Sequence, residues 1–589
     1  MPQIIIDDVR IQVESGKTII EAAEENNIQI PHFCWHPELS VSGNCRMCLV
    51  DVGLPKRLPD GSFEKDSLGN PVIMYFPKLS IACATQISDG MNVLTQSKRA
   101  VEARQSVMEF LLINHPLDCP ICDEAGQCKL QEYAFNHSSG SSRFDEVKNY
   151  KPKRVEWSDK IIFDAERCIS CSRCIRFATE VAEQDVIGFV NRNDHVTIQL
   201  VKGEKFDNPY SMNVIDICPV GALTSSDFRF KARVWDMSFN DSICTGCSRG
   251  CNIKLGIRNN EILRVEPRTN MYVNKYWMCD FGRLNGYEKI NSNRTLDPII
   301  KNGNGQNNNT WELAYDAAAY HLRKIKSTEI MFIGSPYATN EDNYILQKFA
   351  KKIIKSHNID FIPRIDNKFA DGKLSTSDIT PNSKGASIFC NLGTDGIKIN
   401  SLVEKINTGS IKALYLMEDD LSAFPELLKV LSKLELFIIH ASNNFGYMEN
   451  ADIIIPATTY AESEGTFINI NDRVQHFSPA LVTKENLRFM GMKQSRLDKF
   501  GAENDRWTHS EQRNCRQSWR SLQNIANLLG AGWAYKSSKD IFNEIAGLYS
   551  QFQGMTYDKL DEYSGLVLGK GEQPDPKLFA YQSHVMKPE

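Results

Sequence analysis

The spacing of apolar residues predicts a small β-rich region at the start of the chain. QIIIDDVRIQV at residues 3–13 alternates apolar and polar positions on both sides of Asp7–Asp8, which predicts a hairpin. Thr18 and Glu21 form a capping box at the start of TIIEAAEENN, so a helix is expected there. The turn sequences PDG and LGN within residues 53–74 predict a second, inserted hairpin.

The next elements in the first half are a long helix and short strands. Residues 97–114 have helical spacing, which predicts a helix with Val101, Val107–Met108 and Leu111–Leu112 on one face. IIFD at 161–164 and VIGFV at 186–190 resemble strands.

The second half has a different pattern. The predicted helix WELAYDAAAYHLRKIK at 311–326 is followed by apolar strand candidates, which are EIMFIGS, ALYLM, LELFIIH and ADIIIPA. This succession predicts an α/β domain with a parallel sheet. KNGNGQNNN at 301–309 is typical of a turn or linker, residues 490–520 are polar, and the last twenty residues favour loose structure.

Composition excludes several functional classes. The chain has 589 residues and a net charge of −5, which does not suggest nucleic acid as the main partner. No apolar run approaches about 18 residues, so no direct membrane span is expected. The N-terminus MPQIIIDDVR lacks the basic region of a secretory signal. We therefore expect a cytoplasmic location, with docking onto a membrane assembly left open.

The cysteines are concentrated in the first half of the chain. Of 17 cysteines, only Cys390 and Cys515 follow residue 280, and both are interpreted as small buried hydrophobic residues. Clustered cysteines in a reducing compartment point to metal binding rather than to disulfides.

The first and second cysteine sets predict two different clusters. The first set has three ligands close together and one distant ligand in a β-rich region, which is a variant of the 2Fe–2S ferredoxin arrangement: Cys34, Cys45, Cys48 and Cys83. The second set supplies four ligands for a 4Fe–4S cluster from one short segment: His115, Cys119, Cys122 and Cys128. A neutral imidazole ligand should raise the potential of that cluster. His32 and His36 flank Cys34 and are expected to shield its cluster rather than to ligate it.

The third and fourth sets each predict one further 4Fe–4S cluster. The third set has the bacterial ferredoxin spacing with a remote Cys–Pro: Cys168, Cys171, Cys174 and Cys218. The ligand positions of a second ferredoxin cluster carry other residues: Ala178, Asn208, Ser211 and Val214. The fourth set is Cys244, Cys247, Cys251 and Cys279. A structural zinc site is the alternative for the first, second and fourth sets.

Together these sets resemble the large iron–sulfur subunit of respiratory complex I, the NADH:quinone oxidoreductase. The resemblance is carried by CWHPELSVSGNCRMCLV, HPLDCPICDEAGQCKLQ, CISCSRCIRF with CPVGAL, and CTGCSRGC, in the order of the family. It implies an electron conduit that is a peripheral subunit on the cytoplasmic side of the inner membrane. Its partners would be the flavin-bearing, NADH-oxidising subunit and a downstream iron–sulfur subunit that leads to quinone. Electrons would leave through the third set, and the fourth set would lie off the path.

The second half resembles the molybdopterin oxidoreductase domain of formate dehydrogenases. SPYATNEDNYILQKFAKK and ADIIIPATTYAESEGTFIN carry this resemblance. Where those enzymes have a catalytic cysteine or selenocysteine, this chain reads SHNIDFIPRIDNKFADGK, with His357 but no cysteine. The chain also ends soon after this domain, so no molybdopterin is expected. Glu464–Gly465–Thr466 resembles a pterin-contacting loop but is interpreted as an ordinary turn.

These observations predict a multidomain α+β and α/β protein. Its expected domains are a β-grasp 2Fe–2S ferredoxin domain, a one-His, three-Cys 4Fe–4S segment, a bacterial-ferredoxin-like 4Fe–4S domain, a four-Cys 4Fe–4S domain, a molybdopterin-oxidoreductase-like domain and a polar C-terminal extension, at residues 1–95, 96–150, 151–235, 236–295, 296–490 and 491–589. The sequence has no G-x-G-x-x-G motif of the nucleotide-binding kind. The competing functions are a molybdenum formate dehydrogenase or NAD-linked hydrogenase component and a zinc-stapled scaffold.

Overall fold

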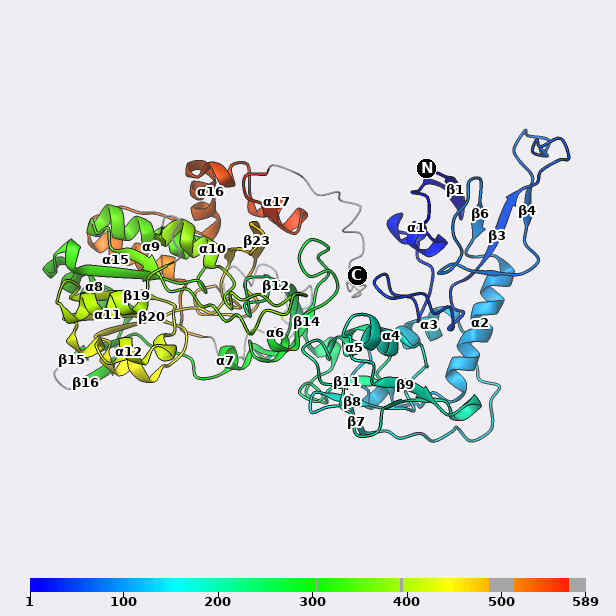
Figure 1. The fold of residues 1–589 in the computed structure, drawn as a ribbon, viewed down its shortest axis with the longest axis horizontal. Coiled ribbons are helices and arrows are strands. Elements are labelled where there is room, and N and C mark those ends of the chain that lie inside the picture. The colour runs from blue at the N-terminus through cyan, green and yellow to red at the C-terminus, as the bar shows by residue number, and fades with distance from the viewer. Residues whose placement is uncertain (303–304, 392–395, 487–512, 571–589) are drawn as a thin grey trace, which may run out of the picture. The chain divides into compact units, whose positions relative to one another are not determined.

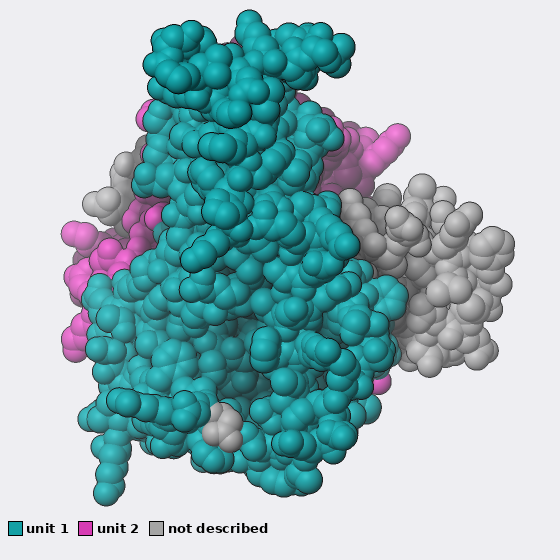
Figure 2. Space-filling view, turned by 90° about the vertical axis from the view of Figure 1, so that its right-hand side faces the viewer, with its two compact units in different colours: residues 1–236, 575–589 teal, residues 237–574 magenta. Residues whose placement is uncertain are grey.

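The computed structural model describes residues 1–302, 305–391, 396–486 and 513–570. The chain divides into two compact units, Met1–Asp236 and Met237–Pro574, which are coloured separately in Figure 2. The polar segment 490–520 lies mostly outside the described residues, as do residues 571–589 at the C-terminus.

The first unit begins with the expected small β-rich region. β1 (Gln3–Ile6) and β2 (Val9–Gln12) form the predicted hairpin, with Asp7 and Asp8 at positive φ in its turn. The expected capping box of Thr18 and Glu21 begins α1 (Ile19–Glu25). The sheet has the order β2-β1-β6-β3-β4, and β5 pairs separately with β3. These later strands are β3 (Leu49–Pro55), β4 (Ile73–Tyr75), β5 (Ser80–Ile81) and β6 (Asn92–Leu94).

The predicted inserted hairpin and long helix are both present. β3 and β4 pair antiparallel, and the residues between them project beyond the sheet in Figure 1. α2 (Lys98–Ile113) begins at the N-cap Ser97. Its fully buried face is formed by Ala100, Arg104 and Met108. The predicted apolar face was therefore wrong by part of a turn, since of its residues only Met108 is fully buried.

A ferredoxin-like region completes the first unit. Its three-stranded sheet has the order β11-β8-β7, and β9 pairs with β10 in a separate hairpin. The strands and helices of this region are β7 (Val155–Glu156), β8 (Ile161–Phe163), β9 (Ile187–Val190), β10 (Thr197–Leu200), β11 (Leu223–Ser225), α4 (Arg173–Glu180) and α5 (Asn213–Ile217). Ala178, Ser211 and Val214 are fully buried, so side-chain packing fills positions that would hold ligands in a two-cluster ferredoxin.

The second unit begins with a meander of three antiparallel strands, β12 (Ser238–Ile243), β13 (Asn252–Arg258) and β14 (Glu261–Pro267). The short helices α6 (Asp280–Leu284) and α7 (Glu288–Asn291) follow it. Ile253, Leu255 and Val265 form part of the buried core between these elements.

The predicted parallel sheet is confirmed. Its order is β16-β15-β21-β20-β19-β17-β18, and the strands from β21 to β18 run parallel. Four of them match the predicted apolar segments: β17 (Ile330–Gly334), β19 (Ala413–Met417), β20 (Leu436–Ala441) and β21 (Ile453–Pro456). The turn or linker expected at 301–309 is mostly wrong, because β15 (Ile299–Asn302) and β16 (Gly305–Asn308) pair as an edge hairpin. Backbone pairing at an exposed edge tolerates the asparagine-rich composition.

Helices cover both faces of this sheet, so its strands are apolar on both sides (Figure 1). Phe332, Tyr415 and Ile438 pack toward a core that includes α8 (Trp311–Lys324) and α9 (Asn340–Lys348). Ile333, Leu416 and Ile439 pack toward the opposite core, with α11 (Ile399–Asn407) and α12 (Pro425–Leu428). The remaining parallel strand is β18 (Ile359–Phe361).

Residues 513–570 differ from the expected polar extension. They form α15 (Ser518–Leu528), α16 (Ser538–Leu548), α17 (Tyr557–Glu562) and β24 (Leu566–Val567). Trp519, Leu522 and Phe542 join the core of the parallel sheet. β24 pairs with β23 (Arg473–Phe477), which pairs with β22 (Gly465–Ile468). Polar residues on the outer faces of these helices hid their apolar stripes.

In the part of the chain that the structure describes, no helix combines the length and the apolar character that crossing a bilayer would need.

Candidate metal centres

The four cysteines of the first set come together in a buried pocket beside β3 and β5. Cys34, Cys48 and Cys83 are buried, and Cys45 is partly exposed. The sulfurs of Cys48 and Cys83 are 3.5 Å apart. The thiols of Cys45 and Cys83 donate to Cys34 and lower its pKa to about 2. The four sulfurs therefore converge on one point, as ligands of a single cluster must.

His32 and His36 lie in the protein interior beside this set. Nδ1 of His32 is 2.9 Å from the carbonyl oxygen of Ile30, and Nδ1 of His36 accepts from the backbone N–H of Glu38. Burial lowers the pKa of both rings, that of His36 to about 2. Two neutral, buried rings fit the expected role of shielding the first set.

The second set is built on a break between two helices. His115 follows α2, Cys119 begins a single 3-10 turn (Cys119–Ile121), and Cys128 is the N-cap of α3 (Lys129–His137). Arg233 donates to the carbonyl oxygens of Cys122 at 2.9 Å and Cys119 at 2.8 Å, which fixes this loop. Cys122 is buried, whereas Cys119 is exposed.

The surroundings of His115 suit a metal ligand. Its Nδ1 atom is buried and has no hydrogen-bond partner. Burial, with a smaller contribution from the positive charge of Arg167, lowers the pKa of His115 to about 4. The ring is therefore neutral at pH 7 and carries a lone pair for a metal. An unpartnered buried nitrogen otherwise costs stability, so this observation favours His115 as the fourth ligand.

The third set wraps around the start of α4. Ser170 and Ser172, between its first three cysteines, both have positive φ, and the N–H of Ser170 donates to Cys168 Sγ at 3.4 Å. Cys174 lies in α4, and Cys218 is the C-cap of α5. Left-handed residues that are not glycine concentrate at functional sites, and here they bend the backbone around the cysteines.

One guanidinium links the first and third sets. Arg176 in α4 donates to the carbonyl oxygen of Cys34 in the first set and to that of Cys171 in the third, the latter at 3.4 Å. Asn44 Nδ2 also donates to the carbonyl oxygen of Ser170 at 3.0 Å. These contacts hold the two cysteine loops against each other.

The third set also adjoins the second set. The backbone N–H of Lys129, directly after Cys128, donates to the carbonyl oxygen of Pro219, directly after Cys218, at 3.1 Å. Gly221 packs so tightly that an added Cβ would lie 2.2 Å from the sulfur of Cys122. The third set therefore has contacts with both others. This arrangement corrects the expectation that electrons leave through the third set, because that set is the middle one.

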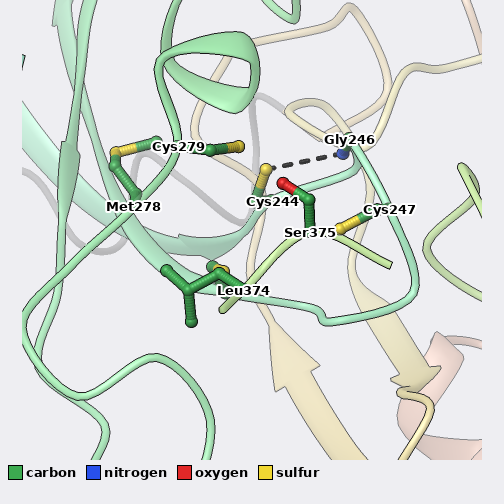
Figure 3. A pocket seen from close by; sticks show the side chains of 8 residues that line it. Cys244, Gly246, Cys247, Met278, Cys279, Leu374 and Ser375 are labelled. Carbon is green, nitrogen blue, oxygen red and sulfur yellow. Dashed lines mark hydrogen bonds between the residues drawn. The ribbon is translucent and has the colours of Figure 1, made fainter. Parts of the chain in front are cut away.

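The fourth set closes the open end of the β12–β13 hairpin in the second unit. Cys244 follows β12, Cys251 precedes β13, and the N–H of Cys244 donates to the carbonyl oxygen of Cys251 at 2.8 Å. Cys279 is the N-cap of α6. All four cysteines of this set are buried. Figure 3 shows the sulfurs of Cys244, Cys247 and Cys279 around one small cavity.

Glycines leave room for sulfur in the fourth set. Backbone N–H groups of Gly246 and Gly282 donate to the sulfurs of Cys244 and Cys279, each at 3.4 Å. A Cβ at Gly282 would lie 2.7 Å from the Cys244 sulfur. Amide donors and close backbone approach suit a cluster that carries negative charge on its sulfurs.

Within the described ranges, no group of three or more His, Cys, Asp and Glu side chains is arranged to hold a single metal ion. Around one Zn²⁺ ion, with Zn–S bonds of about 2.3 Å, thiolate sulfurs stand only about 3.8 Å apart. The four sets therefore fit larger polynuclear clusters better than they fit zinc.

The sequence reasoning named the ligands but missed the residues that connect them. Arg176, Arg233, Gly221 and Gly282 each contact a cysteine of a set, or would clash with it if they were larger. Glycine next to cysteine in CPVGAL and CDFG is the only signal that could have found two of them. The two arginines act over distances in sequence that no local motif reveals.

The second half places its candidate residues away from any such site. Cys390 belongs to the core of the parallel sheet, 3.4 Å from Asn343 Oδ1, and His357 is exposed. Cys515 is buried beside the ion-paired Arg294. Gly465 opens β22, and both the backbone N–H and the hydroxyl of Thr466 donate to Glu341 at 2.9 Å. The loop at Glu464–Gly465–Thr466 is therefore satisfied by its own chain.

Five family models match the chain, in the order expected from the sequence. Their descriptions and residues are a 2Fe-2S iron-sulfur cluster binding domain (2–98), the NADH-ubiquinone oxidoreductase-G iron-sulfur binding region (104–143), the ferredoxin-like domain of NADH-quinone oxidoreductase subunit 3 (158–224), the molybdopterin oxidoreductase Fe4S4 domain (237–292) and molybdopterin oxidoreductase (384–488). The chain thus consists of 2Fe–2S and 4Fe–4S binding domains followed by a domain of the molybdopterin oxidoreductase type, as predicted.

Similar proteins come from bacteria and from a mitochondrial-type complex. The NADH-quinone oxidoreductase G-type iron–sulfur protein of Rickettsia bellii is 36% identical over 354 residues, which are 60% of this chain and 48% of that protein. Subunit 3 of the Thermus thermophilus enzyme is 36% identical over 376 residues, 61% of this chain and 47% of that protein. The 75 kDa subunit of the NADH-ubiquinone oxidoreductase of Reclinomonas americana is 38% identical over 329 residues, 56% of this chain and 44% of that protein.

These matches confirm the predicted similarity to the large iron–sulfur subunit of NADH:quinone oxidoreductase. The chain spans about half the length of the curated relatives it matches. A crystal structure of an NAD+-reducing NiFe-hydrogenase in the H2-reduced state also matches, with a TM-score of 0.33 and 24% identity, over 40% of this chain and 91% of that chain. No conclusion about this chain follows from so low a TM-score.

Proposed function

We propose that this chain is the electron-transferring iron–sulfur subunit of an NADH:quinone oxidoreductase. It would hold one 2Fe–2S cluster with the first set and one 4Fe–4S cluster with each of the other three, and these clusters would supply one-electron carriers. The observation that carries the proposal is the contact of the third set with both the first and the second. Three sets joined by hydrogen bonds and close packing form a continuous line of redox sites, which a zinc scaffold would not need.

The ends of this line differ in exposure, which supports an orientation. At the second set, Cys119 is exposed, and the adjacent Leu117 and Ile121 are 87% and 58% exposed. Trp235 is 55% exposed and stacks on Arg233, which holds the Cys119 loop. Exposed apolar groups around a redox ligand suit the docking of a protein partner. We assign this end to the downstream iron–sulfur subunit.

The first set would face the electron donor. Cys45 is its most exposed ligand and lines an open groove with the exposed Phe110 and Phe189. The donor would be the flavin-bearing subunit that oxidises NADH. In this arrangement, the chain contributes the positions of the redox centres, and hydride chemistry belongs to its partner.

The remaining assignments follow from this function. The chain would belong peripherally to a membrane complex, on the cytoplasmic side of the inner membrane. The fourth set would lie off the main path and contribute to folding, because metal binding is coupled to folding. The family matches support domains close to 1–95, 96–150, 151–235, 236–295 and 296–490. Because residues 513–570 pack into the core of the parallel sheet, we extend the last domain through residue 570.

The test is reduction of the full-length chain by NADH in the presence and absence of the flavin-bearing subunit from the same organism. We expect NADH to bleach the iron–sulfur absorbance only when that subunit is added. A Cys48→Ala variant should then lose the fast reduction of the remaining clusters. Reduction by NADH without the partner, or no reduction with it, would contradict the proposal.

A further inference from the structure

A loop of the α/β domain reaches across to the fourth cysteine set. This cover loop, residues 362–382, connects β18 to α10 (Ser383–Ala386). Leu374 and Ser375 at its tip line the same cavity as the four cysteines. Figure 3 shows the Ser375 hydroxyl directed toward the space between the cysteine sulfurs. The cavity is thus walled by both parts of the second unit.

The base of the cover loop is fixed to the parallel sheet. Arg364 donates to Asp419 Oδ1 at 2.7 Å and to the carbonyl oxygen of Asp420 at 2.8 Å, directly beyond β19. The two sides of the loop pair with each other, since the N–H of Asp366 donates to the carbonyl oxygen of Ser377 at 2.7 Å. The loop is therefore a short ribbon anchored at the carboxyl end of the sheet.

The tip of the loop is shaped by one carboxylate. Asp371 Oδ1 accepts hydrogen bonds from the backbone N–H groups of Lys373, Leu374 and Ser375, at 2.9, 3.2 and 3.1 Å. This turn fixes the backbone of Ser375, whose side chain is buried. The orientation of the Ser375 hydroxyl is thus determined by the loop itself.

Residues between the cysteines hold the tip in place. Arg249, between Cys247 and Cys251, donates to the carbonyl oxygens of Leu374 at 2.9 Å and Lys373 at 3.3 Å. Its neighbour Ser248 donates its backbone N–H to the carbonyl oxygen of Asp378 at 2.9 Å. The cysteine loop and the cover loop therefore form one hydrogen-bonded structure.

We propose that the cover loop is part of the fourth metal centre: Ser375 donates a hydrogen bond to the Cys279 sulfur and raises the reduction potential of the cluster, and Arg249 keeps the loop closed over it. The proposal rests on the proposed function, because it requires a 4Fe–4S cluster in the fourth set. The Ser375 hydroxyl is a donor to Cys279. Hydrogen bonds to cluster sulfurs stabilise the more negative, reduced state, and restricted solvent access protects the cluster. A domain without the catalytic thiol of its relatives would thereby retain a role.

The first experiment measures the potential of the fourth cluster by redox titration with electron paramagnetic resonance, on the anaerobically purified full chain. A Cys247→Ala variant identifies which signal belongs to this cluster. We expect Ser375→Ala to shift that signal to lower potential and Ser375→Thr, which keeps the hydroxyl, to stay close to wild type. Ser377→Ala is the matched control, since Ser377 lies in the same loop without lining the cavity.

The outcomes separate the two proposals. An unchanged potential in Ser375→Ala, with the cluster present, overturns the role of Ser375 and leaves the proposed function intact. Equal iron content in wild type and Cys247→Ala instead shows that the cluster assignment fails, and the cover-loop proposal fails with it.

A second experiment tests closure and stands even if Ser375→Ala cannot retain its cluster. It measures the rate at which an iron chelator removes the fourth cluster. Arg249→Gln should release that iron severalfold faster than wild type, whereas Lys368→Gln, the same charge change at an exposed position of the cover loop, should not. Equal rates in Arg249→Gln and wild type would overturn the closing role.

Discussion

Gly221 provides the sharpest test of the packing between the second and third sets. A methyl group at this position would lie 2.2 Å from the sulfur of Cys122 and 2.9 Å from Cβ of Glu124, both closer than real Cβ contacts allow. The backbone of Gly221 is not in the left-handed region, so the effect of Gly221→Ala is steric. Inserting a methylene-sized group into a packed site costs about 1–3 kcal/mol when the surroundings can shift. A cluster ligand cannot shift freely, so we expect the ligand to be lost instead.

The assay is iron and acid-labile sulfide content, combined with electron paramagnetic resonance of the reduced protein. Gly221→Ala should lose roughly four of about 14 iron atoms and the signal of the second set. Gly188→Ala is the control, because a Cβ at Gly188 in β9 meets nothing within 4 Å. A Gly221→Ala protein with full iron content and an unchanged second-set signal would refute the inferred contact between the two sets.

Three further predictions concern single side chains. His115→Cys should keep the second cluster but lower its potential, on the order of 100 mV, because a thiolate adds negative charge; an unchanged potential in a redox titration would remove His115 from the ligand set. Arg176→Lys keeps the charge but loses the planar fork that joins the loops of Cys34 and Cys171, so rapid-freeze kinetics should show severalfold slower electron exchange between their clusters at normal iron content, and wild-type kinetics would argue against the link. Burial raises the pKa of Glu341 from 4.5 to about 7, so the folded chain retains a proton that the unfolded chain loses, and stability should fall by about 3 kcal/mol as pH rises from about 4.5 to 7; thermal unfolding at pH 5 and pH 8 should show a smaller loss in Glu341→Gln, and equal losses would contradict the assignment.

The cysteine spacing and the strand pattern carried most of the correct predictions. Four buried strands of the parallel sheet appeared as short apolar runs, because helices cover both of its faces. The turn at Asp7–Asp8 and the capping box at Thr18 were visible because local hydrogen bonding determines them. The domain order was recognisable because each cluster type requires its ligands at characteristic intervals.

The errors arose where distant parts of the chain decide the structure. α15 and α16 were hidden within a polar stretch because only one face of each helix is apolar, and that face packs on strands more than sixty residues away. The middle position of the third set depends on Arg176 and Gly221, whose contacts lie about 100 residues or more away in sequence. Ser375 lies 96 residues beyond Cys279 in a loop with no recognisable motif.

The central claim is that the chain holds a line of iron–sulfur clusters, and metal analysis tests it most directly. Iron, acid-labile sulfide, zinc and molybdenum should be measured on the anaerobically purified full-length protein. We predict roughly 14 iron atoms with matching sulfide, from one two-iron and three four-iron clusters, and no stoichiometric zinc or molybdenum. Zinc in place of iron in the first three sets would contradict the electron-transfer function, and stoichiometric molybdenum would instead favour a formate dehydrogenase component.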